Sequence, residues 1–424
     1  MKRVSLLIMI MFLGIGLMVG FVRISVAAEP IVIGVPTALK QPESIDSFRS
    51  AELAVEEINA KGGVLVGGVK RSFKIISLDT AEERPGIPIH DILAGVEKLV
   101  LEKKPHAIVV GAYRSESFLA QMDMIAKYKL PYLETISLTG SFEERMQKDP
   151  EKYRNIFRIC LNVPTSILYY TELLKFLNKE FGFNRILFTV QDILAFQQTA
   201  QAVQKWCKEN GWEVVGYDAY PTGSSDFSTT LAKAKGLKAQ IIFPIYYTAE
   251  SSILLKQARS ARTPAILVGY VGPATQENAW GVFEGQVEGL VNLCYSIGQI
   301  PVKTVPKSGE YNKAYGKKWG EDLRRKLVGH GPASGYDAVY ILADAIRRAG
   351  TLDGNSIVSA LEKTDINGAI GRIRFNKNHQ VVYGLDPKEA AVGCLFQWKK
   401  PGTRVPVFPL PIAEGKIDLP SYIK

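Results

Sequence analysis

The strongest constraint on the fold is a regular alternation of short apolar runs with longer segments whose apolar residues recur every three or four positions. The runs IVIGVP (31–36), KIISLD (74–79) and AIVV (107–110) predict strands, and the segments between them predict amphipathic helices. Strands that alternate with helices form parallel sheets whose two faces are covered by the helices. The sequence therefore predicts a doubly wound α/β fold.

The same alternation starts again after FRIC (157–160), and a chain of 424 residues is longer than one core usually organises. We therefore expect two doubly wound parallel-sheet lobes. Further strands are expected at RILFTVQD, AQIIFPIY, AILVGYV and AVGCLFQW, and a hairpin at GRIRFNKNHQ. The Pro-rich tail PGTRVPVFPLP (401–411) cannot join the interior of a sheet, so we expect it on the surface.

The N-terminus has the pattern of an export signal. A basic start, MKR, precedes a long apolar stretch (4–22), and Val26 and Ala28 have the small-residue spacing that signal peptidase reads. We expect a signal peptide at 1–28 and a mature periplasmic chain that begins near Glu29. An uncleaved membrane anchor is the alternative.

Charge and cysteine spacing exclude several kinds of partner. Removal of Lys2, Arg3 and Arg23 with the signal lowers the net charge from +10 to +7, and the remaining cations are scattered, so no nucleic-acid partner is expected. No metal site or other cofactor is expected, because the cysteines lack metal-type spacing. An exported chain with four cysteines could carry one or two disulfides, and their pairing stays open. The cysteines are Cys160, Cys207, Cys294 and Cys394.

A polar segment follows the buried run AIVV and leads into a helix from about Ser115. Ligands of open α/β sheets bind beyond the carboxyl ends of the strands, so Arg114, Ser115 and Ser117 should face a cleft between the lobes. Free N–H groups at the helix start would favour an anion there. The alternative is that Ser115 is only the helix N-cap.

Segments throughout the chain resemble the leucine/isoleucine/valine-type solute-binding proteins that feed bacterial ABC importers. The resemblance extends from about residue 31 to residue 398, and the order and spacing of the segments carry it. The segments are IVIGVP, AELAVEEINAKGGV, IVVGAYRSES, LPYLET, DFSTTLAKAK, LLKQARSARTPAILVG and GYDAVYILADAIRRAG.

This resemblance implies a type I periplasmic binding protein, in which a three-strand hinge joins two lobes that close on a small solute. The hinge crossings are then expected near 159–162, 293–298 and 390–394. The implied division is a signal peptide at 1–28, a first lobe at 29–160 plus 297–390, and a second lobe at 161–296 plus 391–424.

The resemblance also implies a ligand site. Family members hold the ligand carboxylate just after the third strand, which matches Ser115, and a second contact matches the segment ISLTG (136–140). The second lobe supplies aromatic residues, although Gln197 replaces a family glycine. Arg114 as a surface cation, and aromatic residues that only pack the lobes, are the alternatives. The expected ligand-binding residues are Tyr113, Arg114, Ser115, Ser137, Thr139, Phe196, Tyr246, Tyr247 and Tyr270.

One departure from the family concerns the ligand ammonium. Amino-acid binders place a Glu where this chain has Val271, and a buried ammonium without a counter-charge is costly. Either another acid, such as Glu134 or Glu116, replaces it, or the solute lacks an ammonium. The aromatic set favours a carboxylate with an apolar or aromatic body. The first loop, KQPES (40–44), also departs from the family, so specificity on that wall cannot be transferred.

No catalytic residue is expected, because the histidines are isolated and no hydrolase elbow or phosphate loop is present. We therefore expect a solute-binding protein that delivers a small carboxylate-bearing solute to the permease of an ABC importer. A ligand sensor of the same fold is the alternative.

Overall fold

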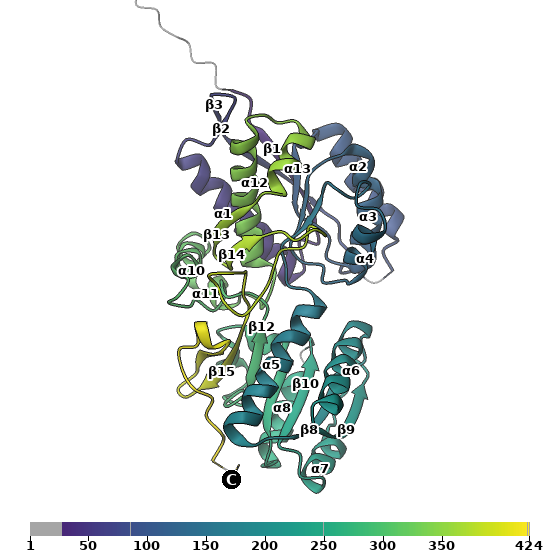
Figure 1. Ribbon diagram of the computed structural model, residues 1–424, viewed down its shortest axis with the longest axis vertical. Coiled ribbons are helices and arrows are strands. Elements are labelled where there is room, and N and C mark those ends of the chain that lie inside the picture. The colour runs from purple at the N-terminus through teal and green to yellow at the C-terminus, as the bar shows by residue number, and fades with distance from the viewer. Residues whose placement is uncertain (1–27, 85, 249, 422, 424) are drawn as a thin grey trace, which may run out of the picture.

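The computed structural model describes residues 28–424 except 85, 249, 422 and 424. These residues form two lobes, each with its own sheet and with helices outside (Figure 1). The doubly wound α/β fold predicted from the sequence is confirmed. The expected signal peptide lies outside the described residues apart from Ala28. Within the described ranges, no helix has the length and apolar character needed to cross a membrane.

The first sheet consists of five parallel strands. Its central strand, AIVV, is buried at every position, as expected for a parallel strand covered on both faces. In spatial order the strands are β4 (Phe73–Asp79), β1 (Ile31–Thr37), β5 (Ala107–Val110), β6 (Tyr132–Glu134) and β7 (Ile156–Arg158).

Helices cover both faces of this sheet. Helix α1 packs against α12, which comes almost 300 residues later in the chain, and α2 packs against α3. The helices of this lobe are α1 (Pro42–Ala60), α2 (Ile89–Lys103), α3 (Ser115–Tyr128), α4 (Ser141–Lys148), α12 (Pro332–Ala349) and α13 (Gly354–Leu361), with the small ribbons β2 (Val64–Val66), β3 (Val69–Arg71), β13 (Asp365–Gly368) and β14 (Gly371–Arg374).

The second sheet has seven strands. Five are parallel, and the last two join antiparallel at one edge. In spatial order they are β16 (Thr403–Phe408), β15 (Cys394–Lys399), β12 (Val291–Cys294), β11 (Ile266–Val271), β10 (Ile241–Tyr246), β8 (Arg185–Gln191) and β9 (Glu213–Tyr220).

The helices of the second lobe begin with α5, which leads out of the junction between the lobes (Figure 1). The Asn162 side chain caps α5 by accepting a hydrogen bond from Thr165 N at 3.0 Å. The helices of this lobe are α5 (Val163–Phe181), α6 (Leu194–Glu209), α7 (Ser228–Gly236), α8 (Ser251–Ser260), η1 (Gly272–Thr275), α9 (Ala279–Val282) and η2 (Leu410–Ile412). After β12 come α10 (Pro306–Trp319) and α11 (Glu321–Arg325), and α10 packs against α1 and α12 of the first lobe.

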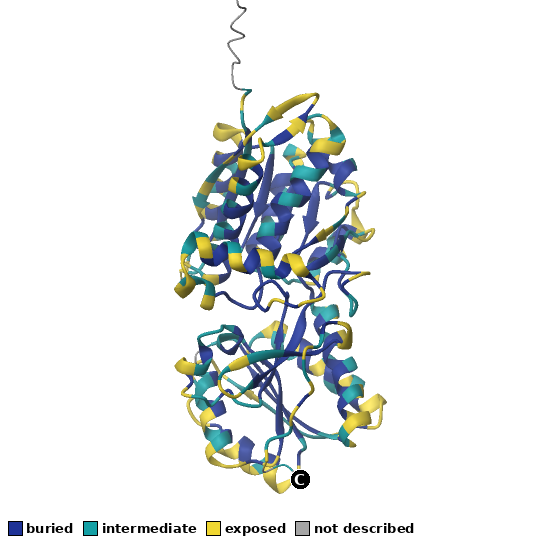
Figure 2. Ribbon diagram, turned by 90° about the vertical axis from the view of Figure 1, so that its left-hand side faces the viewer, coloured by how far each residue is buried: buried dark blue, intermediate teal, exposed yellow. Residues whose placement is uncertain are grey.

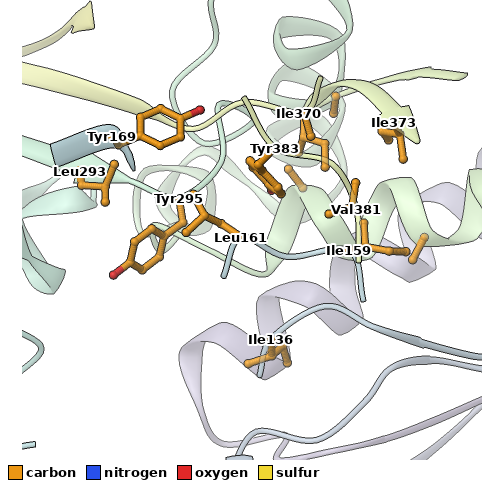
Figure 3. Close-up of a cluster of buried hydrophobic side chains, with 14 of the residues drawn as sticks. Ile136, Ile159, Leu161, Tyr169, Leu293, Tyr295, Ile370, Ile373, Val381 and Tyr383 are labelled. Carbon is orange, nitrogen blue, oxygen red and sulfur yellow. The ribbon is translucent and has the colours of Figure 1, made fainter. Parts of the chain in front are cut away.

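The central strands of both sheets are buried, whereas the outward faces of the helices are exposed (Figure 2). One apolar cluster extends from the first lobe into the second through the junction. Figure 3 shows part of this cluster, in which Leu161 lies beside Tyr295 and Ile159 lies beside Val381. The junction is therefore filled by apolar side chains from segments that are distant in sequence.

The Pro-rich tail and the cysteines both differ from what the sequence suggested. The Pro-rich tail does not merely lie on the surface, because it forms edge strand β16 and buries Val407 and Phe408. An edge position tolerates Pro406, which has no N–H for the hydrogen-bond ladder of the sheet.

All four cysteines are buried free thiols. They include Cys294 and Cys394, which face each other across β12 and β15.

A proline inside β10 explains a glycine in the neighbouring strand. Pro244 lacks an N–H, and the β10–β11 register is interrupted between the Ile242–Leu267 and Ile245–Tyr270 pairs. A Cβ on Gly269 would lie 2.0 Å from the Pro244 carbonyl oxygen. The close approach of the two strands therefore requires glycine at position 269.

We expect Gly269→Ala to lower the free energy of unfolding by about 2 kcal/mol, because the added methyl group overpacks rigid backbone. Urea unfolding followed by circular dichroism measures the change. Gly236→Ala is the matched control, since a Cβ there meets no atom within 4 Å. Equal stability of the two variants would contradict this account of β10 and β11.

Candidate functional site

A tight turn at the end of β5 starts the candidate site. Gly111 N donates to Val109 O at 3.0 Å, and the turn gives Val110 a φ of 73° and Gly111 a φ of 84°. Such a φ is strained for a β-branched residue, and strained backbone is concentrated at functional positions. The turn is followed by Tyr113 and by α3, which begins at Ser115 as predicted. The N-cap residue is Arg114, so the alternative that Ser115 is only the N-cap is wrong.

A buried carboxylate of the same lobe accepts a hydrogen bond from the first backbone amide at this helix start. Glu82 is buried, and its Oε2 accepts a hydrogen bond from Arg114 N at 2.8 Å. Burial raises the pKa of Glu82, although the Arg114 amide opposes this rise. The Arg114 guanidinium is one-third exposed and lies 3.7 Å from Glu116. Arg114 and Glu116 thus form a surface ion pair beside the helix start.

A second internal carboxylate supports the end of β6. Glu134 is fully buried and accepts from Ala112 N at 3.0 Å, Ile136 N at 2.8 Å and Ser137 N at 2.9 Å. The Tyr132 hydroxyl donates to it as well, at 3.1 Å. Burial raises the pKa of Glu134 to about 7 against the effect of these donors. Glu134 therefore uses its acceptor capacity within the first lobe.

Ser137 and Thr139 lie on the loop between β6 and α4. Ser137 is buried, and its hydroxyl has no hydrogen-bond partner among the described residues. The Thr139 hydroxyl accepts from Ser141 N at 3.3 Å, and the Thr139 carbonyl accepts from the Arg158 guanidinium at 2.5 Å. Arg158 is fully buried and forms an ion pair with Glu143. This buried cation fixes the loop that carries Ser137 and Thr139.

Three of the four expected aromatic residues of the second lobe lie near one another. Tyr270 packs edge-on against Phe196, with ring centroids 6.2 Å apart, and stacks on Tyr295 at 4.9 Å. Tyr247 follows the end of β10, and its N–H donates to Gln191 Oε1 at 2.9 Å. Tyr247 and Tyr270 lie at the carboxyl ends of the neighbouring strands β10 and β11, and Phe196 lies in the first turn of α6, which follows β8.

Tyr246 lies elsewhere. Its hydroxyl is 2.6 Å from the Thr189 hydroxyl, and its ring packs edge-on against Phe227. Consecutive residues of a strand point to opposite faces of the sheet, so Tyr246 and Tyr247 diverge. The structure places Tyr246 in a different apolar cluster from the one that contains Tyr270.

Polar side chains connect the two lobes directly. The Tyr247 hydroxyl donates to Glu43 Oε1 at 2.5 Å, across 204 positions of sequence. On the first lobe, Gln41 Nε2 donates to the Tyr113 hydroxyl at 2.5 Å, and the hydroxyls of Tyr113 and Tyr247 also interact. We call Gln41, Glu43, Tyr113, Tyr247 and Tyr270 the interlobe cluster.

Burial dominates the electrostatics of the interlobe cluster. It raises the pKa of Glu43, and the hydrogen bond from Tyr247 only partly offsets the rise. The pKa of Tyr247 is raised first by burial and then by the charge of Glu43. Burial followed by the Glu43 charge likewise raises the pKa of Tyr113. The cluster thus holds ionisable groups away from bulk water.

Sequence reasoning missed three residues of this region. It made no inference about Gln41 and Glu43, although an acid shortly after the end of β1 stands at the carboxyl edge of the sheet. It also treated His330 as isolated, but His330 is buried against the Tyr295 ring, with centroids 5.6 Å apart. Burial lowers the pKa of His330 to about 4. No local sequence pattern marks His330.

Two lobes with a polar and aromatic cluster between the carboxyl ends of their sheets define the class of two-lobed solute-binding proteins. Among the described residues, no group of three or more His, Cys, Asp or Glu side chains could hold a metal ion. The interlobe cluster offers hydrogen-bonding groups and aromatic surfaces to a ligand.

The chain belongs to the periplasmic binding protein family, whose profile matches residues 30–386. The family resemblance inferred from the sequence is thereby confirmed. Members of this class bind solutes for ABC transporters and are not enzymes, in agreement with the sequence prediction. The Leu/Ile/Val-binding protein homolog 7 of Brucella melitensis is 24% identical over 384 residues, which cover 89% of this chain and 90% of the relative.

Solved structures show the same fold. A putative branched-chain amino acid ABC transporter from Silicibacter pomeroyi has a TM-score of 0.80 at 19% identity, covering 93% of this chain and 100% of that chain. A solute-binding protein of an ABC transporter from R. palustris, in complex with benzoate, has a TM-score of 0.64 at 14% identity, covering 92% and 98%. The fold therefore occurs in a protein that binds a carboxylate without an amino group.

We expect Arg158→Met to destabilise the protein by about 3–5 kcal/mol, because it leaves Glu143 and the Thr139 carbonyl without their buried cation. Urea unfolding measures this change. Arg325→Met is the matched control, because Arg325 is 54% exposed in its pair with Glu277 and should change stability by less than about 1 kcal/mol. A loss in Arg158→Met no larger than in the control would contradict the anchoring role.

Proposed function

We propose that this protein is the extracytoplasmic solute-binding component of an ABC importer. It closes its two lobes on a small carboxylate-bearing solute and delivers the closed form to the membrane permease. The observation that carries this proposal is the interlobe cluster, in which Tyr247 of one lobe and Glu43 of the other meet at 2.5 Å. Membership of the periplasmic binding protein family supports it.

The proposed lobes are 29–160 plus 297–390 and 161–296 plus 391–424. Sheet membership supports this division, because the first sheet contains only strands from 31–158 and the second only strands from 185–294 and 394–408. Helix α12, which packs on α1, supports assignment of the later segment to the first lobe. The proposed hinge crossings are then near 159–162, 293–298 and 390–394.

Closure is a two-state process in this proposal. The free lobes fluctuate between open and closed arrangements, and a solute that contacts both walls stabilises the closed one. The start of α3 receives the solute carboxylate, since the first N–H groups of a helix and its partial positive charge favour an anion. Ser115 and Thr139 add hydroxyl groups, and Phe196, Tyr247 and Tyr270 contact the body of the solute.

The contacts in this proposal are sufficient for micromolar binding of the solute. Hydrogen bonds to a charged group contribute about 1.5–3 kcal/mol each, and aromatic walls add apolar burial. Two or three such bonds with a buried apolar body give about −8 kcal/mol, which corresponds to micromolar binding.

A thermal-shift screen of amino acids, aromatic acids, short-chain acids and amides tests the proposal, because a ligand of the native state raises Tm. We expect a carboxylate-bearing solute to raise Tm and to shrink the radius of gyration in small-angle scattering. The double variant Ser115→Ala and Thr139→Ala should weaken binding of that solute at least tenfold.

Ser260→Ala is the control, since Ser260 is exposed at the C-terminal end of α8 and distant from the strand ends. Unchanged affinity in the double variant would remove Ser115 and Thr139 from the site. Failure of every carboxylate to bind would overturn the proposed solute class.

A further inference from the structure

Glu43 has an unusual environment for an acid. It stands in the first turn of α1 and is 3% exposed. Tyr247 donates to its Oε1, whereas Oε2 is buried and has no hydrogen-bond partner among the described residues. A buried carboxyl oxygen without a donor is costly, so such groups call for a functional explanation.

Among the described residues, the groups that act on Glu43 are another acid and three tyrosines. Its electrostatic neighbours are Asp46, Tyr113, Tyr247 and Tyr270. Asp46 is itself satisfied, because Arg49 lies 3.2 Å from it and the Tyr315 hydroxyl donates to it at 3.0 Å. The tyrosines are neutral. The local field around Oε2 therefore favours a positively charged partner.

The other acids near the site differ from Glu43. Glu82 also has a buried oxygen, Oε1, without a hydrogen-bond partner among the described residues, but Arg114 supplies it with a backbone donor to Oε2 and with a positive charge. Glu134 accepts three backbone N–H groups and the Tyr132 hydroxyl, all within the first lobe. The Glu116 side chain is 67% exposed and lies beside Arg114. Val271, at the end of β11 on the opposite lobe, has no charge. Among these positions, Glu43 alone combines burial, a location between the lobes and an unpartnered oxygen.

The structure also links Glu43 to the start of α3. Gln41, the N-cap of α1, donates to the hydroxyl of Tyr113, which precedes Arg114 and Ser115. One wall of the site thus presents an acceptor at Glu43 and helix N–H donors at Ser115. A solute lying along this wall would meet opposite charge preferences at its two ends.

We propose that Glu43 is the counter-charge for a cationic nitrogen of the solute, so that the solute is a zwitterion with a carboxylate at α3 and an ammonium at Oε2. This inference rests on the proposed solute-binding function. It assigns the counter-charge to the first lobe, in the first turn of α1, and not to the strand end at Val271. The same carboxylate then joins solute, Tyr247 and α1, so an ammonium-bearing solute also strengthens closure.

Calorimetric titration of the mature chain with pairs of amino acids and their deaminated acids tests this assignment. L-Phenylalanine with 3-phenylpropanoate and L-leucine with 4-methylpentanoate are the first pairs, because the members of each pair differ only by the ammonium group. We expect the native chain to bind the amino acid of at least one pair at least tenfold more tightly than its partner.

Glu43→Gln should lose at least tenfold in affinity for that amino acid and change little toward the deaminated acid. Glutamine keeps the size and an oxygen acceptor, so the loss reports the charge. Glu56→Gln on the same helix is the matched control, because the Glu56 side chain is 66% exposed. An unchanged Tm of ligand-free Glu43→Gln shows that a loss of affinity does not come from unfolding.

The outcomes separate this inference from the function on which it rests. Equal binding of both members of every pair, or an unchanged affinity in Glu43→Gln, overturns the role of Glu43 while solute binding stands. A protonated Glu43 that donates to the solute carboxylate would make the native chain, but not Glu43→Gln, bind the deaminated acid more weakly as the pH rises, so the absence of that difference excludes it. If no acid of either kind binds, the proposed solute class fails and the role of Glu43 fails with it.

Discussion

The hydrogen bond from Tyr247 to Glu43 depends on both lobes ending their parallel strands at the same gap. Each sheet presents strand ends, helix starts and tight turns at its carboxyl edge, where backbone groups need partners. Tyr247 follows the end of β10 and Glu43 lies in the first turn of α1, so neither lobe forms the contact alone. The apolar cluster through the junction keeps these edges opposed.

Buried acids give this site its character. Glu82 and Glu134 take backbone N–H groups that follow β5 and β6, and they fix the loops as internal ligands. Glu43 differs from both, because its hydrogen-bond donor is Tyr247, from across the gap. Three carboxyl groups at one sheet edge thus differ in role because their hydrogen-bond donors differ.

Sequence periodicity was sufficient to predict the two sheets, because buried parallel strands have continuous apolar runs. The sequence also predicted the helix start at Ser115, and the family resemblance, not periodicity, suggested the aromatic residues Phe196, Tyr247 and Tyr270. It failed where partners are distant in sequence. Nothing in KQPES reveals that Glu43 meets Tyr247, and strand alternation, which separates Tyr246 from Tyr247, requires knowledge of where β10 ends. The Pro-rich tail joined an edge, where a missing N–H is tolerated.

The pairing of α1 with α12 has a consequence for how the protein folds. The two helices cover the same face of the first sheet, yet the strands β8 to β12 of the second lobe lie between them in the chain. Contacts between distant segments form only after a long loop has closed, at a cost in chain entropy. The five parallel strands of the second sheet can assemble from neighbouring segments, whereas the first lobe must wait for residues 332–349 to complete its core, and strands β15 and β16 join the second sheet later still. During synthesis, both lobes are therefore completed by segments near the C-terminal end of the chain.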